Sequence, residues 1–241
     1  MNLIVDIGNS TVKAAVFDGE KLLVRRRLTG HLPDALAMLA DEFHPIEACA
    51  YASVGTEMPQ VEQMLRHLVP NALLRVTGLT PSPLRSAYRT PETLGADRWA
   101  AVVGAAKLLP ATDLMVVDVG TCITYDYVSA EGTYQGGNIS LGLGMRLRAL
   151  HEQTARLPLV GVAGEAPVVG HDTPTAIRSG VLQGMACEIE GYVQRFQRLH
   201  PEGRVFLTGG NAYRFAQDYE VERNDSLVEI GLNTLLEYAR H

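Results

Sequence analysis

The chain has 241 residues, of which 46% are apolar and 20% are charged, a balance that is typical of a globular protein. Its formal net charge of -6 offers no overall positive field that would attract nucleic acid or an anionic membrane surface. We therefore expect neither a nucleic-acid nor a membrane partner. No apolar run approaches the roughly 20 residues that cross a bilayer, and Asp6 interrupts the apolar start, so a cytoplasmic location is expected. The 3 cysteines are widely spaced, which predicts reduced thiols.

The first apolar strand, residues 3–7, ends in an aspartate and a glycine-containing turn, Asp6 to Ser10. The same pattern returns at residues 115–122, where Asp118 takes the place of Asp6. Two further strands joined by a turn follow each copy, at 11–17 and 21–28 and again at 123–128 and 133–139. A repeat of nearly half the chain length predicts two homologous lobes, residues 1–112 and 113–241, which face each other across a cleft.

Helical and extended segments alternate after each three-strand meander. The pattern predicts an α/β fold with a mixed sheet in each lobe, and residues 77–92 read as a long functional loop. The predicted helices are 33–43, 57–68, 93–109, 145–154, 175–199 and 227–240, and the predicted strands between them are 48–54, 72–76 and 204–207.

The two Asp-x-Gly turns are suited to bind phosphate. Glycine permits close backbone approach, the hydroxyls of Ser10, Thr11 and Thr121 can hold phosphate oxygens, and each aspartate can hold a cation. The chain has no P-loop sequence, so phosphate binding would have to use turns of this kind. The alternative is a hairpin turn that happens to contain aspartate and glycine, and the duplication weighs against that alternative.

The segment Gly95-Ala96-Asp97-Arg98 opens an apolar helix. Asp97 could cap this helix and offset its dipole. It could equally act as a general base for a substrate hydroxyl, with Arg98 beside it to bind a carboxylate. Spacing alone does not choose between the two roles.

Two glycine pairs are interpreted as turns between a strand and a helix. They are Gly136-Gly137 and Gly209-Gly210, and each is followed by an asparagine. Such turns are common in α/β proteins, so they carry no function by themselves. In an open α/β sheet, however, this end of a strand is where ligands bind, and glycine would let the backbone lie against a nucleotide.

Taken together, Asp6 to Ser10, Gly95 to Arg98, Asp118 to Thr121, Gly136 to Ile139 and Thr208 to Gly210 resemble the motifs of the type III pantothenate kinases. The resemblance covers almost the whole chain and includes Tyr88 before Asp97. It implies an actin-like, duplicated ribonuclease-H-like fold and a homodimer. It also implies transfer of phosphate from ATP to pantothenate, which gives 4'-phosphopantothenate in the first step of coenzyme A synthesis.

The resemblance also implies roles for individual residues. Asp97 would be the proton acceptor, Asp118 would bind a monovalent cation (K+ or NH4+), and Asp6 would bind Mg2+ indirectly. The expected substrate-binding residues are Tyr88, Gly95, Ala96, Asp97, Arg98 and Thr173, with Thr175 as an alternative to Thr173. The expected ATP-binding residues are Asp6, Ile7, Gly8, Asn9, Ser10, Thr11, Val12, Lys13, Thr121, Gly209 and Gly210.

Three positions depart from the family pattern: Leu141 replaces a proline, Cys122 an alanine and Ser10 a threonine. The segment after Gly137 is rich in apolar residues, which fits a homodimer, although these residues could instead serve the core of the lobe itself. The apolar residues of this segment are Leu141, Leu143, Met145, Leu147 and Leu150.

Two other functions stay open, a regulatory protein without catalysis and a phosphatase on the same fold.

Overall fold

The structure, a computed structural model, describes residues 1–55, 58–70, 72–210 and 219–241. The chain divides into two compact units. Unit 1 consists of Met1–Thr112, Tyr127–Gly136 and Ser226–His241, and unit 2 of Asp113–Asp126 and Gly137–Asp225. Residues 127–136 and 226–241 thus group with unit 1 although they follow residue 112 in sequence. The division into homologous lobes at residue 112 stays a prediction.

The first sheet lies in unit 1 and has five strands in the order β3-β2-β1-β4-β5. The first three strands form an antiparallel meander, whereas β4 and β5 run parallel to β1, so the sheet is mixed. All six residues of β1 are buried, which is the pattern of a central strand that is covered on both faces. The strands are β1 (Asn2–Ile7), β2 (Val12–Asp18), β3 (Lys21–Leu28), β4 (Ala48–Ser53) and β5 (Leu73–Arg75).

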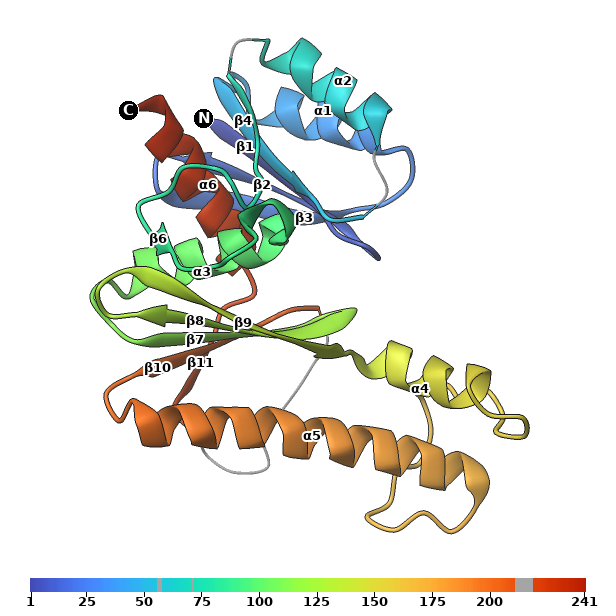
Figure 1. Cartoon of the computed structure of the whole chain (residues 1–241). Coiled ribbons are helices and arrows are strands. Elements are labelled where there is room, and N and C mark those ends of the chain that lie inside the picture. The colour runs from blue at the N-terminus through green and yellow to red at the C-terminus, as the bar shows by residue number, and fades with distance from the viewer. Residues whose placement is uncertain (56–57, 71, 211–218) are drawn as a thin grey trace. The chain divides into compact units, whose positions relative to one another are not determined.

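Four helices cover this sheet. Figure 1 shows α1 (Leu32–Glu42) and α2 (Pro59–Leu68) on one face, and α3 (Ala96–Leu108) and α6 (Leu227–Arg240) on the other. Leu36, Leu39 and Leu65 of the first two helices are almost completely buried against the strands. Each such leucine contributes about 1.5 to 3 kcal/mol through removal of its side chain from water. The sheet that carries Asp6 is therefore packed against a buried apolar core.

Close packing joins α3 to α6. A Cβ atom at Gly231 of α6 would lie 1.7 Å from the carbonyl oxygen of Ala100, and a Cβ atom at Gly104 would lie 2.2 Å from that of Leu227. The two glycines let the helix backbones approach each other directly. The C-terminal helix thereby supports the helix whose first turn contains Asp97.

The second sheet has six strands in the order β11-β10-β7-β8-β9-β6. Its strands β9-β8-β7-β10-β11 repeat, position for position, the order β3-β2-β1-β4-β5 of the first sheet. This repeated topology confirms the α/β fold with two mixed sheets that the sequence predicts. The strands are β6 (Arg85–Ser86), β7 (Leu114–Val119), β8 (Cys122–Ser129), β9 (Thr133–Leu141), β10 (Arg204–Thr208) and β11 (Val221–Arg223).

In the described residues of unit 2 there are two helices. The long helix α5 (Thr173–Leu199) lies along the strands of this unit, and α4 (Leu143–Glu152) packs beside its N-terminal part (Figure 1). Leu147 of α4 is buried with Val160, Ile177 and Val181. None of the helices in the described ranges combines the length and the apolarity that a membrane span requires.

Several predicted elements need correction. Residues 77–92 contain the two-residue strand β6 and the start of a 3-10 helix, η1 (Pro91–Thr93), and α3 begins at Ala96 rather than at residue 93. Gly136 and Gly137 lie inside β9 and not at a turn into a helix, so that interpretation was wrong. The reason is packing: Gly136 has φ +103° and leaves room for an aromatic ring that only the folded chain brings to this strand. Strand β11 was not predicted.

Candidate active site

The turn between β1 and β2 carries the first group of predicted site residues. The amide of Gly8 donates a hydrogen bond to the carbonyl oxygen of Thr11 (3.0 Å) and closes the turn. Asn9 and Ser10 are exposed at its tip and Thr11 is half-buried, so hydroxyl, amide and backbone groups are accessible together. Ile7 and Val12 face each other in the sheet register and are buried, so they can offer a ligand only their backbone.

Asp6 and Lys13 occupy opposite positions at the base of this turn. They are partners in the sheet register, and Lys13 Nζ lies 3.5 Å from Asp6 Oδ2. Asp6 is only 6% exposed. Burial raises the pKa of Asp6 from 3.8 to about 6, Lys13 opposes this shift, and the charges of Glu229 and Asp97 add to it. Asp6 therefore lies among carboxylates, where added positive charge would be stabilising.

This arrangement fits a divalent cation that arrives with a phosphate ligand. Carboxylate oxygen is the donor that Mg2+ prefers, and burial raises the pKa of Asp6 more than the charge of Lys13 lowers it. In the described part of the chain, no cluster of three or more His, Cys, Asp or Glu residues could hold a metal ion alone. Mg2+ commonly keeps several waters and binds through one or two carboxylates plus substrate phosphates.

Asp97 lies in the first turn of α3. Gly95 occupies the N-cap position and provides no side-chain cap, while one oxygen of Asp97, Oδ1, accepts a hydrogen bond from the amide of Arg98 (2.8 Å). A Cβ atom at Gly95 would lie 2.6 Å from that same oxygen, so glycine makes room for the carboxylate. Ala96 is buried beneath it, whereas Asp97 is half-buried. Asp97 thus satisfies a backbone donor through one oxygen, and this contact alone excludes neither predicted role.

Arg98 and three aromatic residues form the next group. Arg98 is only 7% exposed, and its Nη2 donates a hydrogen bond to the hydroxyl of Tyr134 (3.1 Å). The guanidinium carbon lies 5.9 Å from the centroid of the Tyr88 ring. Tyr88 stacks on Tyr134 with centroids 5.9 Å apart, and Trp99 contacts Tyr134 edge-on at 5.8 Å. The structure therefore brings Tyr88 and Arg98, two of the expected substrate-binding residues, together with Tyr134, which sequence reasoning did not single out.

The corresponding turn of unit 2 lies at the end of β7. The amide of Gly120 donates to the carbonyl of Cys122 (2.9 Å), and Thr121 is exposed at the tip. Strand β10 runs parallel to β7 with Thr208 opposite Asp118, so the following glycine reaches the aspartate. A Cβ atom at Gly209 would lie 2.6 Å from Asp118 Oδ1 and 2.5 Å from the carbonyl oxygen of Val119. Carboxylate and carbonyl oxygens here fit a hard cation.

The remaining predicted residues of unit 2 lie at the turn after β10 and at the start of α5. Gly210 is exposed and has open space around its Cα, whereas Asn211 lies outside the described residues. Thr175 is buried and completes a capping box: its amide donates to Asp172 Oδ1 (2.8 Å), and its hydroxyl accepts from the Asp172 amide (3.1 Å). Thr173 is exposed. Of the two threonines, Thr173 therefore has the accessible side chain.

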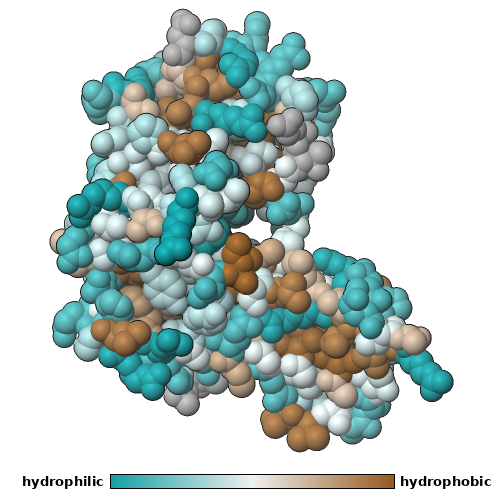
Figure 2. All heavy atoms as spheres, viewed as in Figure 1, coloured by the Kyte–Doolittle hydropathy of each residue, from teal (hydrophilic) through white to brown (hydrophobic). Residues whose placement is uncertain are grey.

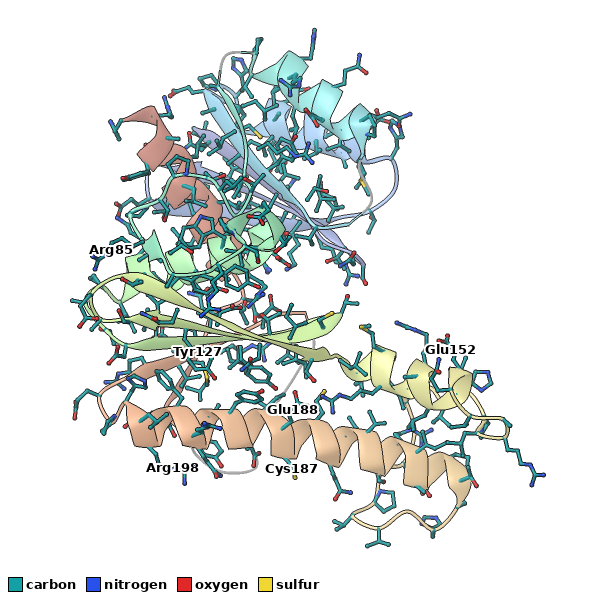
Figure 3. The ribbon with its side chains drawn as sticks, viewed as in Figure 1. Arg85, Tyr127, Glu152, Cys187, Glu188 and Arg198 are labelled. Carbon is teal, nitrogen blue, oxygen red and sulfur yellow. The ribbon has the colours of Figure 1, made fainter. Side chains whose placement is uncertain are left out.

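A second polar cluster in unit 2 connects α4 and α5 to the sheet. Glu188 of α5 accepts hydrogen bonds from the Tyr125 hydroxyl (2.9 Å) and from Arg146 of α4. Arg146 also donates to the Ser140 hydroxyl at 3.1 Å. Figure 3 shows Glu188 on the side of α5 that faces the strands of this unit, with Cys187 on the other side. The cluster contains no predicted site residue. Its hydrogen bonds hold α4 and α5 against the strands, which is a structural role.

Two mixed sheets that share one order of five strands, with an aspartate near the end of the central strands β1 and β7, define an actin-like ATPase fold. Solved structures that share the fold over nearly the whole chain include the activator of the 2-hydroxyisocaproyl-CoA dehydratase from Clostridium difficile (TM-score 0.54, 13% identity, covering 98% of this chain and 93% of that one). The ethanolamine utilization protein from Carboxydothermus hydrogenoformans is similar (TM-score 0.54, 15% identity, 97% and 89% covered).

The sequence comparisons are more specific. Residues 2–195 match the family described as type III pantothenate kinase. A type III pantothenate kinase of Phocaeicola vulgatus is 44% identical over 240 residues, which cover 99% of this chain and 98% of the relative. One from Porphyromonas gingivalis is 43% identical, with 98% of each chain covered. The chain belongs to the type III pantothenate kinase family, as its motifs predict.

Proposed function

We propose that this protein transfers the γ-phosphoryl group of ATP to the hydroxyl of pantothenate and so catalyses the first step of coenzyme A biosynthesis. Membership of the family supports this proposal. The observation that carries it is the geometry of α3, where Asp97 at the first turn is followed by a buried arginine that is held among aromatic rings. A carboxylate base beside an arginine suits a substrate with a hydroxyl and a carboxylate.

The proposed reaction forms one phosphorus–oxygen bond, breaks another and transfers one proton. The pantothenate hydroxyl oxygen attacks the γ-phosphorus, Asp97 takes the hydroxyl proton, and the bond to the β-phosphate bridging oxygen breaks to release ADP. Phosphoryl transfer passes through a loose transition state, so catalysis is mainly positioning and charge stabilisation. Asp6 to Lys13 would hold phosphate oxygens through backbone amides, hydroxyls and the Lys13 ammonium group. Tyr88, Gly95, Ala96 and Arg98 would line the pantothenate site.

Cations have two proposed positions. Mg2+ bound with ATP would neutralise phosphate charge, with Asp6 nearby as the carboxylate that orders its waters. Asp118 is the proposed ligand of a monovalent cation, K+ or NH4+, and its placement against Gly209 and the carbonyl of Val119 supports this assignment. Thr121, Gly209 and Gly210 are proposed contacts of ATP, and exposed Thr173 is the proposed substrate-contacting threonine.

We also propose a cytoplasmic homodimer. Leu147 is buried in the core of unit 2, with Leu143 and Leu150 partly buried against it, so these residues contribute to that core. Other apolar side chains of the unit support the proposal because they are exposed: Leu159 by 62%, Val168 by 84% and Val169 by 79%. Figure 2 shows apolar residues gathered on the part of unit 2 that contains α4 and α5. A surface patch of this kind is typical of an interface.

A coupled assay of ADP release tests the proposal. The purified protein is mixed with ATP and Mg2+ in potassium buffer, with and without pantothenate, and mass spectrometry identifies the product. We expect ADP release only with pantothenate, a product one phosphate heavier, and a large loss of rate when a bulky organic cation replaces potassium. Release of ADP without pantothenate would indicate a hydrolase, and no release under either condition would indicate a protein without catalysis.

A further inference from the structure

Tyr134 lies at the centre of the aromatic group around Arg98 and has no role in the proposed chemistry so far. It is the second residue of β9, and its side chain is completely buried. The Tyr88 ring stacks on it at an interplanar angle of 29°, and the Trp99 ring meets it at 61°. Trp99 is fixed in turn, because its indole Nε1 donates to the carbonyl oxygen of Thr80 (3.2 Å). The position of the Tyr134 hydroxyl is therefore set by packing on several sides.

This hydroxyl accepts the hydrogen bond from Arg98 Nη2. A guanidinium group is planar and carries its donors in a rigid fork, so fixing one donor orients the whole fork. The guanidinium carbon of Arg98, Cζ, lies over the Tyr88 ring, 5.9 Å from the ring centroid, which is within the range of a cation–π contact. One buried tyrosine thus contacts both predicted pantothenate-binding side chains, the arginine through its hydroxyl and the tyrosine through its ring.

The backbone of β9 is adapted to this arrangement. Gly136 follows Tyr134 on the same strand and has φ +103°. A Cβ atom at this position would lie 3.4 Å from Cδ2 and 3.7 Å from Cε2 of Tyr88. The glycine therefore leaves the Tyr88 ring room to stack on Tyr134. The Tyr88 ring therefore explains why position 136 is a glycine, although it lies inside a strand and not at a turn.

From these contacts we infer that Tyr134 is a positioning residue that orients the Arg98 guanidinium toward the carboxylate of the substrate. The inference rests on the proposed function, because it assigns Arg98 the role of binding that carboxylate. An arginine that is already oriented loses less side-chain freedom when the substrate binds, so the effect falls on substrate affinity. The alternative is that Tyr134 only fills the core, in which case its hydroxyl would not affect any one substrate group.

The test is Tyr134→Phe, which keeps the ring and removes only the hydroxyl. We expect the KM for pantothenate to rise about tenfold, because the loss of one hydrogen bond to a charged group changes an equilibrium by about that factor. The kcat and the KM for ATP should stay within about twofold of the parent values. The matched control is Tyr125→Phe, which removes the buried hydroxyl that donates to Glu188 in unit 2. That control should leave the KM for pantothenate unchanged.

A second substrate separates positioning from a general structural effect. The analogue of pantothenate that carries an alcohol in place of the carboxylate offers Arg98 no charged group of the substrate. The KM for this analogue should be the same for the parent and for Tyr134→Phe. Because KM does not depend on the amount of folded enzyme, partial unfolding of the variant would not change this comparison. In an Arg98→Lys background, Tyr134→Phe should add less than a twofold change to the KM for pantothenate.

Results that contradict the positioning role of Tyr134 differ from the result that contradicts the proposed function. An unchanged KM for pantothenate in Tyr134→Phe, or an equal rise for pantothenate and the alcohol analogue, would overturn the positioning role while the proposed function stands. A parent protein without pantothenate-dependent ADP release would overturn the proposed function, and the inference would fall with it.

Discussion

Asp97 satisfies a backbone donor of its helix and is also the proposed general base. Its Oδ1 accepts the amide hydrogen of Arg98, which satisfies one of the donors that the first turn of a helix leaves without an intrahelical partner. The neighbouring Gly95 leaves space for the carboxylate of Asp97. The charge of Asp97 contributes to the raised pKa of Asp6. The capping and catalytic roles are therefore compatible in one residue, and only the second predicts a loss of turnover.

The variant Asp97→Asn distinguishes the two roles. Asparagine keeps an oxygen that can accept the Arg98 amide hydrogen, but it is not basic enough to take a proton from an alcohol. We expect kcat to fall by about 10²- to 10⁴-fold while the melting temperature changes little. The control is Asp34→Asn in the first turn of α1, which should leave both quantities nearly unchanged. An Asp97→Asn protein that phosphorylates pantothenate near the parent rate would place the base elsewhere.

Asp6 offers a prediction about stability and pH. Its carboxyl group is neutral in the folded and unfolded protein below pH 3.8 and charged in both above pH 6, because burial raises the folded pKa from 3.8 to about 6. The folded protein therefore loses stability as the pH rises from about 4 through about 6. The difference between the two pKa values corresponds to about 3 kcal/mol at most.

Replacing Asp6 with asparagine should remove this pH dependence. In urea unfolding with a chelator and without nucleotide, we expect Asp6→Asn to be more stable than the parent at pH 8 and similar to it near pH 4. Activity should nevertheless be lost. Asp18→Asn, an exposed position at the end of the neighbouring strand, is the control and should show no such difference. A parent and an Asp6→Asn protein with parallel stability profiles would contradict the buried-charge argument.

At the scale of elements, the first turn of α3 depends on a helix from the other end of the chain. The contact of α3 with α6 is so close that Gly104 and Gly231 have no room for a methyl group. Polar contacts fix α6 on the sheet: Asn2 Nδ2 donates to Asn233 Oδ1 (2.9 Å), and Arg25 Nε lies 2.7 Å from Glu229 Oε1. A displacement of α6 would therefore move α3 and, with it, Asp97 and Arg98.

Glycine-to-alanine substitutions in three helices test this contact. Gly231→Ala and Gly104→Ala should each lower the free energy of unfolding by about 1 to 3 kcal/mol, because the added methyl group overlaps a carbonyl oxygen of the neighbouring helix. Gly180→Ala in α5 is the matched control, since nothing lies within 4 Å of its added Cβ atom. It should stabilise by up to about 1 kcal/mol through its higher helix propensity. Equal effects at all three positions in thermal or urea unfolding would refute close helix contact as the cause.

At the scale of the whole molecule, the distribution of apolar side chains bears on the association of two chains into a homodimer. The apolar residues between Leu141 and Leu150 are divided between two uses. Leu147 is buried in the core of unit 2, whereas Leu141 is 44% exposed, and the segment before α5 exposes Val168 and Val169 far more. The alternative that these residues serve the core of their own lobe thus holds for part of the set only. The exposed part supports a second copy of the chain as the partner.

Sedimentation at low micromolar concentration tests the proposed homodimer. The parent protein should sediment at twice the chain mass of 26.2 kDa, and the double variant Val168→Glu, Val169→Glu should sediment as a single chain with its melting temperature nearly unchanged. Met38→Glu on α1, where the side chain is 73% exposed, is the control and should not dissociate the dimer. A parent that sediments near 26.2 kDa would remove the homodimer from the proposal.

Local patterns in the sequence determined most of the fold of this protein. Strands, turns and helices leave periodic and capping signals within about ten residues, so the repeated meander and the C-terminal helix 227–240 were predictable, and the family motifs could be read in order. The start of α3 was placed three residues early because η1 precedes it, and the two- and three-residue strands β6 and β11 are too short to leave a periodic signal.

Tertiary structure alone decided which side chains meet. Tyr134 is far from Arg98 in sequence, and Glu229, whose charge helps to raise the pKa of Asp6, comes from the last helix. The proposal of Thr173 rather than Thr175 as the substrate contact also rests on the capping box at the start of α5, because only the folded chain shows that the Thr175 hydroxyl is used there. The physical reason is the same in each case: hydrogen bonds, ring stacking and burial act between residues brought together by folding, and no local period encodes them.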